Sequence, residues 1–165
     1  MLRLTFLGTS AAQPTIGRNL TGDALRRERE LFLVDCGEGT QRQMIRFGTG
    51  FDVDAIFFTH FHADHYLGAI GFLRTLSMQG RTTPMDLYGP RPAKRLLDVM
   101  LFTGTERLSF DVRIHEVAPG DDVEAADARR ARRGPREGAE HVDRRALAGA
   151  VGAEEAEHLS RRDGE

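Results

Sequence analysis

The aromatic residues of this 165-residue chain all lie in its first two-thirds, and this break limits which part can fold. All twelve, ten Phe and two Tyr, occur at or before Phe110. From residue 124 to residue 165, 31 of the 42 residues are Ala, Arg, Glu or Gly. Because such a segment buries too little apolar surface to offset its conformational entropy, we expect a structured part over 1–123 and a disordered or out-of-frame tail over 124–165.

Composition argues against two classes of protein. The single cysteine, Cys36, cannot form an internal disulfide, which argues against a secreted disulfide scaffold and suggests a reducing compartment. No apolar run approaches the roughly 20 residues that span a bilayer, and the first residues lack the layout of a signal peptide. The net charge of −2 gives no general attraction to nucleic acid.

Strand and helix patterns alternate along the first part of the chain. Leu2, Leu4 and Phe6 alternate with polar residues and predict a half-buried strand that ends at Gly8. Further strands are predicted over 31–34, 53–59, 85–88 and 110–117, and helices over 38–47, 64–79 and 91–102. This order predicts an α/β fold in which helices pack on a sheet.

A cluster of metal-binding residue types follows the strand predicted over 53–59, where the sequence reads His-Phe-His-Ala-Asp-His from His60 to His65. In extended backbone, residues two apart point the same way, so His60 and His62 can bind one ion. Asp64 and His65 lie where the chain turns into a helix and suit a second ion. Two divalent ions about 3.5–4 Å apart can activate water and stabilise the leaving oxygen of a phosphodiester. A polar surface turn rarely places four such groups directly after a buried strand.

This His-x-His-x-Asp-His run resembles the signature of the metallo-β-lactamase superfamily. Four flanking blocks resemble the ribonuclease Z family of tRNA 3′-processing endonucleases: Phe6–Ser10, Pro14–Asn19, Asp35–Gln41 and Tyr88–Pro90. The resemblance runs from about Leu2 to Val123 and covers only the N-terminal half of that family. It implies a metallo-β-lactamase-like αβ/βα sandwich with the first half present and the second half absent or scrambled, which would leave an apolar sheet face uncovered.

The resemblance also implies a role for each matching residue. His60 and His62 would bind one Zn²⁺ and Asp64 and His65 another, two per complete site, with Asp64 also the catalytic general base or proton shuttle. Asp35 would hold a ligand histidine in one tautomer. The implied activity is zinc-dependent removal of the 3′ trailer of precursor tRNA, leaving a 3′-hydroxyl on the tRNA. A cytoplasmic homodimer without membrane association is implied as well.

Three further features have a structural and a functional interpretation. The loop Pro14–Asn19 touches the RNA or is an ordinary surface loop. Arg26, Arg27 and Arg29 fit a solvated hairpin turn better than a phosphate site. Cys36 is expected to be a small buried residue rather than a nucleophile, since nothing near it would lower its pKa.

The family completes its site from the second half, with a histidine for the first ion, an aspartate that bridges both ions and a final histidine. His141 falls where the first of these is expected, His115 lies on the polar face of a strand, and His158 has no motif around it. Four ligands shared by two ions leave each short of the three usual for catalytic zinc, so we expect the chain alone to be weak or inactive.

Two other functions stay open: an inactive remnant or metal-binding half-domain completed by a partner, and another hydrolase of the superfamily. The origin of the tail has three explanations, which we rank as a reading-frame error near Glu124, a natural truncation, and a second half supplied by another chain.

Overall fold

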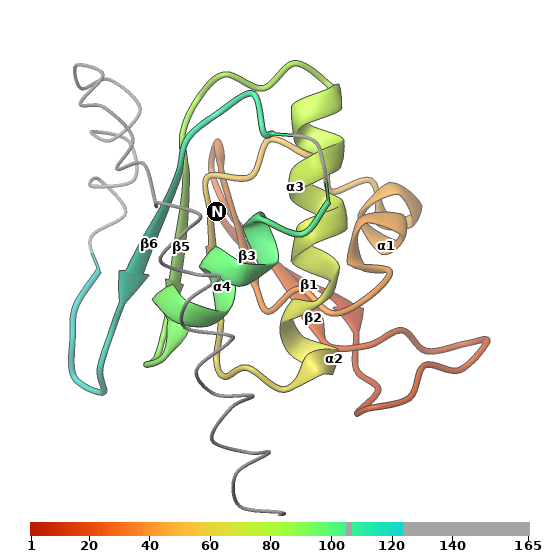
Figure 1. Cartoon of the computed structure of the whole chain (residues 1–165). Helices are drawn as coiled ribbons and strands as arrows, with labels where there is room; N and C mark the ends of the chain where they lie inside the picture. Colours follow the sequence, from red (N-terminus) through yellow and green to blue (C-terminus); the bar gives the residue numbers. More distant parts are fainter. Residues whose placement is uncertain (105–106, 124–165) are drawn as a thin grey trace, which may run out of the picture. The chain divides into compact units, whose positions relative to one another are not determined.

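The computed structural model describes residues 1–104 and 107–123 (Figure 1). The predictions for the tail from residue 124, including His141 and His158, lie outside the described residues. In the described ranges, no helix is long and apolar enough to cross a membrane.

One six-stranded sheet organises the fold, and its strands lie side by side in sequence order. Its first three strands are antiparallel neighbours: β1 (Leu2–Gly8), β2 (Gly22–Arg27) and β3 (Glu30–Val34). The next three continue from β3 in parallel: β4 (Ala55–Phe57), β5 (Met85–Gly89) and β6 (Val112–Glu116). Because parallel neighbours need a crossover connection, each step from β3 onward passes through a helix.

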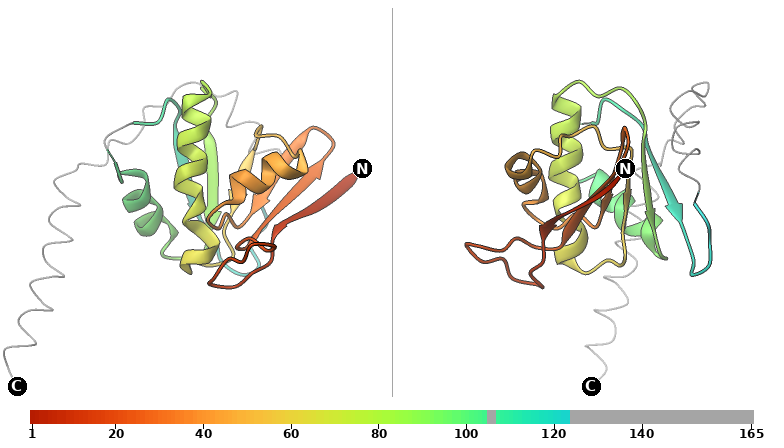
Figure 2. Two further views of the ribbon diagram at one scale, coloured as in Figure 1. Left: turned by 90° about the vertical axis from the view of Figure 1, so that its right-hand side faces the viewer. Right: turned by 180° about the vertical axis from the view of Figure 1, so that it is seen from behind.

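The helices lie together on one face of the sheet (Figures 1 and 2). They are α1 (Thr40–Phe47), α2 (Ala63–Tyr66), α3 (Gly68–Met78) and α4 (Ala93–Leu101). Right-handed crossovers between strands that follow one another in order put every helix on the same side. The main core forms there, where Leu33, Ile56 and Leu87 of the central strands join Phe72 of α3 and Leu97 of α4. The predicted α/β fold with helices on a sheet is confirmed.

The other face of the sheet carries a smaller apolar cluster of Phe32, Ala55 and Tyr88. On β1 the side chains of Leu2, Leu4 and Phe6 are 65%, 51% and 62% exposed, so the prediction that they form the buried side of a strand is wrong. Successive side chains of β1, the edge strand, point to opposite faces of the sheet. Leu4 pairs with Leu25, which packs against the smaller cluster, so this row points away from the helices.

Most predicted elements are present with shifted ends, and one strand was missed. β2 has no clear apolar alternation, and its sequence Gly-Asp-Ala-Leu-Arg-Arg did not stand out as a strand. The helix predicted over 64–79 is divided into α2 and α3. The hairpin predicted at the arginines is present, because β2 and β3 pair around Glu28, whose φ is 54°. Arg27 and Arg29 are exposed as predicted, but the guanidinium of Arg26 donates to the Thr49 carbonyl oxygen at 2.6 Å.

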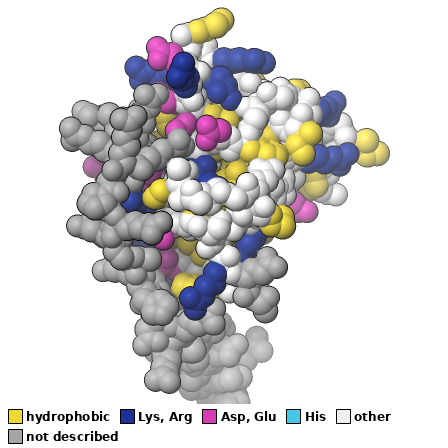
Figure 3. Space-filling view, turned by 90° about the horizontal axis from the view of Figure 1, so that it is seen from above, with side chains coloured by type: hydrophobic (Ala, Val, Ile, Leu, Met, Phe, Trp, Pro, Cys, Tyr) yellow, Lys and Arg dark blue, Asp and Glu magenta, His cyan; other side chains and the backbone are white. Residues whose placement is uncertain are grey.

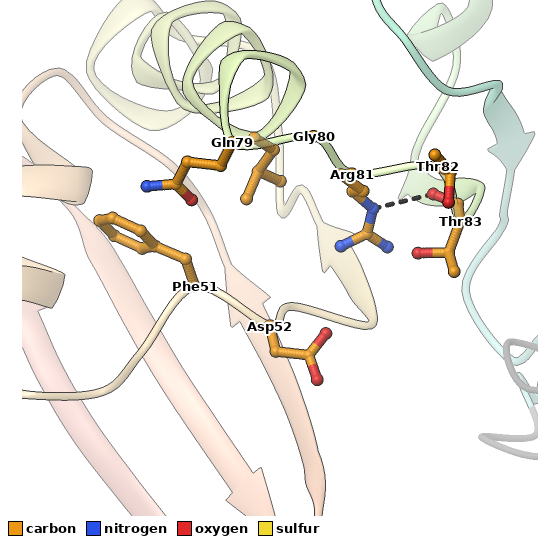
Figure 4. A pocket seen from close by; sticks show the side chains of 8 residues that line it. Phe51, Asp52, Gln79, Gly80, Arg81, Thr82 and Thr83 are labelled. Atoms are coloured by element: carbon orange, nitrogen blue, oxygen red, sulfur yellow. Dashed lines mark hydrogen bonds between the residues drawn. The ribbon is translucent and has the colours of Figure 1, made fainter.

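The end of the sheet at which β4 and β5 begin holds a pocket of about 400 Å³ (Figure 4). Its lining includes Arg81, whose guanidinium donates to the carbonyl oxygens of Val53, Thr83 and Pro84 at 2.9–3.0 Å. This arginine therefore ties together the two loops that lead into the strands. Seen from above, the described surface shows Lys or Arg, Asp or Glu and hydrophobic side chains, and no histidine is visible (Figure 3).

Candidate metal centre

The four predicted metal-binding residues follow the carboxyl end of β4, and Asp35, predicted to orient one of them, follows that of β3, at the end of the sheet opposite that pocket. Asp35 comes directly after β3, and the segment from Thr59 to His65 follows β4 and leads into α2. Because β3 and β4 are parallel neighbours, their carboxyl ends meet and these residues come together.

Asp35 forms the buried base of the site and is only 3% exposed. Its Oδ1 accepts a hydrogen bond from the Thr59 amide at 2.8 Å, and its Oδ2 lies 2.8 Å from Nδ1 of His65. Because a carboxylate oxygen only accepts, Nδ1 of His65 carries the proton and Nε2 keeps its lone pair for a metal ion. The contact predicted between Asp35 and one of the clustered histidines is thus present.

Thr59 is a site residue that the sequence interpretation missed. Its hydroxyl lies 2.8 Å from Oδ2 of Asp35 and 3.0 Å from Nδ1 of His60. Because the one hydroxyl proton goes to the carboxylate, the hydroxyl oxygen accepts from His60 Nδ1, which leaves Nε2 of His60 as a donor to metal. The available signal was a hydroxyl residue directly before the first histidine, at the end of a buried strand.

His60 and His62 lie as the sequence predicted, with their rings turned toward each other. Nε2 of His60 is 3.0 Å from Nδ1 of His62. Two nitrogens bound to one tetrahedral zinc ion at 2.0–2.1 Å are about 3.3 Å apart. This pair therefore suits one ion with little rearrangement.

Asp64 and His65 form a second pair, in which Oδ2 of Asp64 is 3.6 Å from Nε2 of His65. The same Oδ2 accepts a hydrogen bond from the backbone amide of Ala12 at 2.8 Å. That hydrogen bond is the largest cause holding the pKa of the Asp64 carboxyl below its usual value. Asp64 is therefore ionised at neutral pH and able to bind a cation or accept a proton.

The site is only partly assembled by these four residues. Within residues 1–104 and 107–123, no three His, Cys, Asp or Glu side chains stand together in a way that could hold a metal ion. The donor types and the distances within each pair suit divalent zinc, but a third protein ligand for either ion is not supplied by the described residues.

Close backbone packing joins the turn after β3 to the turn before α3. A Cβ on Gly37 would lie 2.2 Å from the Asp64 carbonyl oxygen, and one on Gly68 would lie 2.0 Å from the Gly37 carbonyl oxygen. Between them, the amide of Cys36 donates to His65 O at 2.6 Å. Cys36 is fully buried, and burial raises the pKa of its thiol to about 12, so the predicted buried, unreactive cysteine is confirmed as buried.

The remaining candidate residues lie apart from the histidine cluster or on its rim. His115 bonds to Asp86 through Nε2 at 2.8 Å and stacks on Tyr88, which places it in the β5–β6 pair. The loop Pro14–Asn19 is largely exposed, and Asn19 at its end donates to the Glu38 carbonyl oxygen at 2.8 Å.

Comparison with known proteins adds an independent observation. The family profile described as the Metallo-beta-lactamase superfamily matches residues 24–152. A ribonuclease Z of Myxococcus xanthus is 66% identical over 123 residues, which are 74% of this chain and 40% of that protein. The crystal structure of the short form of human tRNase Z superposes with a TM-score of 0.62 at 39% identity, over 70% of this chain and 45% of that chain.

A diphosphatase from the PhnP family superposes with a TM-score of 0.58 at 26% identity, over 72% of this chain and 51% of that chain. The chain spans about two-fifths of the length of the curated relatives that it matches.

Proposed function

The chain belongs to the metallo-β-lactamase superfamily, and from this premise we propose that residues 1–123 are the metal-binding half of a ribonuclease Z that removes the 3′ trailer of precursor tRNA. The observation that carries the proposal is the joined set of ligand histidines, with Asp35 and Thr59 orienting His60 and His65. The 66% identity to a protein named ribonuclease Z supports the choice within the superfamily.

In this proposal, His60 and His62 hold one divalent ion and Asp64 and His65 hold a second, with zinc as the metal. Bound zinc supplies Lewis-acid chemistry that lowers the pKa of water and neutralises charge on a phosphodiester. Residues beyond those described complete each coordination shell, because two ligands are fewer than catalytic zinc requires.

The chain's own residues contribute binding and proton transfer. Asp64, ionised and held by the Ala12 amide, accepts the proton of the attacking water. The water oxygen bonds to phosphorus, and the bond from phosphorus to the 3′ oxygen of the tRNA breaks. The 3′ oxygen leaves with a proton as a 3′-hydroxyl on the tRNA, and the trailer keeps the phosphate at its 5′ end. Precursor tRNA as partner, a homodimer and a cytoplasmic location all belong to this proposal.

A chimera tests the proposal, because it supplies what this chain does not. Residues 1–123 would be joined to the part of the Myxococcus xanthus ribonuclease Z that the chain does not match, and precursor tRNA with a 3′ trailer would be added with Zn²⁺. We expect a tRNA product with a 3′-hydroxyl, and loss of that product with His62→Ala. The proposal fails if the chimera is folded and inactive while the unaltered Myxococcus protein cleaves in the same assay. The full 165-residue chain by itself is expected to be weak or inactive.

A second candidate is a hydrolase that acts on a small phosphate ester, which the likeness to a diphosphatase of the PhnP family favours. The 26% identity to this diphosphatase is lower than the 39% identity to human tRNase Z, so we place the small-ester hydrolase second. Cleavage of a small phosphodiester by the chimera, without cleavage of precursor tRNA, would reverse this order. If the chain is instead a metal-binding half-domain that acts only with a partner, it should bind zinc, and no single chain should turn over substrate.

A further inference from the structure

The loop between β1 and β2 projects from the fold beside α2 (Figures 1 and 2). Its base is closed by the Ser10 amide, which donates to the Asn19 carbonyl oxygen at 2.9 Å. At its tip the Thr15 amide donates to Arg18 O at 2.8 Å, and Ile16 between them is fully exposed. The loop is therefore a formed hairpin-like arm whose apolar tip is available for contact.

Ala12 connects this arm to the metal centre. Its amide donates to Oδ2 of Asp64, 52 residues further along the chain, at 2.8 Å. Ala12 has a φ of 58°, a left-handed conformation that residues other than glycine seldom adopt. The arm is thus held in an uncommon conformation at the residue that bonds to the catalytic carboxylate.

The contact restrains the same oxygen of Asp64 that faces Nε2 of His65 at 3.6 Å. His65 itself is fixed by Asp35 at its other ring nitrogen. One member of this ligand pair is thus oriented from the sheet, and the other is oriented from the arm. A change in the arm would leave His65 in place and turn the Asp64 carboxylate.

We propose that the backbone N–H of Ala12 is a positioning group for Asp64, so that the arm over residues 9–19 orients one ligand of the second metal ion. The inference rests on the proposed function, since it takes Asp64 and His65 as ligands.

Cobalt titration of the full 165-residue chain tests this without relying on cleavage, because Co²⁺ absorbs visible light when bound by histidine and carboxylate. Ala12→Pro removes the N–H and also excludes the positive φ of Ala12, whereas Ala12→Gly keeps the N–H and tolerates that φ. Ala12→Val keeps the N–H but disfavours the positive φ, so it shows how much of any loss comes from the backbone conformation alone. We expect Ala12→Pro to bind the second Co²⁺ 10–100-fold more weakly, the range found when a ligand's supporting partner is lost. Binding of the first Co²⁺ should not change, and Ala12→Gly should bind both ions like the unsubstituted chain.

Two controls separate positioning from disturbance of the loop. Ile16→Pro puts proline into the same arm without removing the Ala12 amide and should leave both Co²⁺ affinities unchanged. In an Asp64→Asn background, Ala12→Pro should cause no further loss, because its effect passes through that carboxylate. The positioning role is overturned if Ala12→Pro causes no loss, or an equal loss in the unsubstituted chain and in the Asp64→Asn chain. Neither result contradicts the proposed function. If only the chimera binds Co²⁺, the same variants are compared in the chimera. Failure of both the unsubstituted chain and the chimera to bind Co²⁺ overturns the metal-site proposal as well.

Discussion

The hydroxyl of Thr59 connects His60 to the Asp35–His65 pair, since it bonds both to Asp35 and to His60. Replacing it by valine keeps the shape but removes the partner that sets the tautomer of His60. We expect Thr59→Val to weaken zinc binding 10–100-fold in a competition titration with a chromophoric chelator. Thr59→Ser restores the hydroxyl and should restore the affinity. Equal affinities for the valine and serine variants would contradict this role.

Cys36 offers a test of burial at the back of the site. Burial raises its thiol pKa to about 12, so the reactive thiolate is scarce at pH 8. We expect the native chain to react with a disulfide reagent at least 100-fold more slowly than the urea-unfolded chain. Rapid reaction of the native chain at pH 8 would show that the turn after β3 opens readily.

Asp23 lies on β2, and its Oδ1 is buried without a hydrogen-bond partner among the described residues. Burial, and then the charge of Asp35, raise the pKa of its carboxyl above the usual 3.8. Because the folded state holds the proton more tightly, this group destabilises the fold at neutral pH and ceases to do so as the pH falls through its folded pKa and below 3.8.

We therefore expect Asp23→Asn to raise the free energy of unfolding at pH 7, by less than about 1 kcal/mol because the residue is partly exposed. The gain over the unsubstituted chain should shrink toward pH 3 in paired urea titrations. A gain that stays constant with pH would mean that the charge of Asp23 is not its cause.

At the scale of elements, α3 contains two glycines with opposite surroundings. A Cβ on Gly68 would overlap the Gly37 carbonyl oxygen at 2.0 Å, whereas one on Gly71 meets only the Gln41 side chain at 3.5 Å. We expect Gly68→Ala to lower the free energy of unfolding by about 1–3 kcal/mol and to weaken zinc binding. Gly71→Ala should raise it by about 0.5–1 kcal/mol, because alanine favours a helix. Urea unfolding of the two variants measures the expected decrease and the expected increase in the free energy of unfolding in the same experiment.

The element order was predictable because strands and helices differ in apolar period, and the metal motif because its ligands are adjacent in sequence. β2 was missed because its buried positions are Gly22 and Ala24, whose small side chains give no apolar alternation in the sequence. The contact between Ala12 and Asp64 was not predictable, because it joins residues 52 positions apart through a backbone atom that has no sequence signature. The alternation of Leu2, Leu4 and Phe6 with polar residues predicted a strand correctly, but alternation does not say which face of the sheet the helices cover.

At the scale of the whole molecule, the described part has helices on one face of its sheet (Figure 2). On the opposite face, Phe32, Ala55 and Tyr88 of the smaller cluster are buried, whereas Leu2, Leu4 and Phe6 of β1 are exposed. The exposed apolar row on β1 is unfavourable in water and attracts other apolar surfaces. In the proposed function, this face packs against the part of the fold that the relatives have and the described residues do not supply.

The chain alone should therefore bind a hydrophobic dye such as anilinonaphthalene sulfonate, and the chimera with the rest of the Myxococcus protein should bind several-fold less. Leu4→Lys places a charge on the face and should lower dye binding by the chain while destabilising the chimera. Ile45→Lys is the matched control, because Ile45 is exposed on α1, on the helix side of the sheet. It should change dye binding by the chain little and leave the chimera stable. Equal effects of the two lysines on the chimera would mean that the second half packs elsewhere.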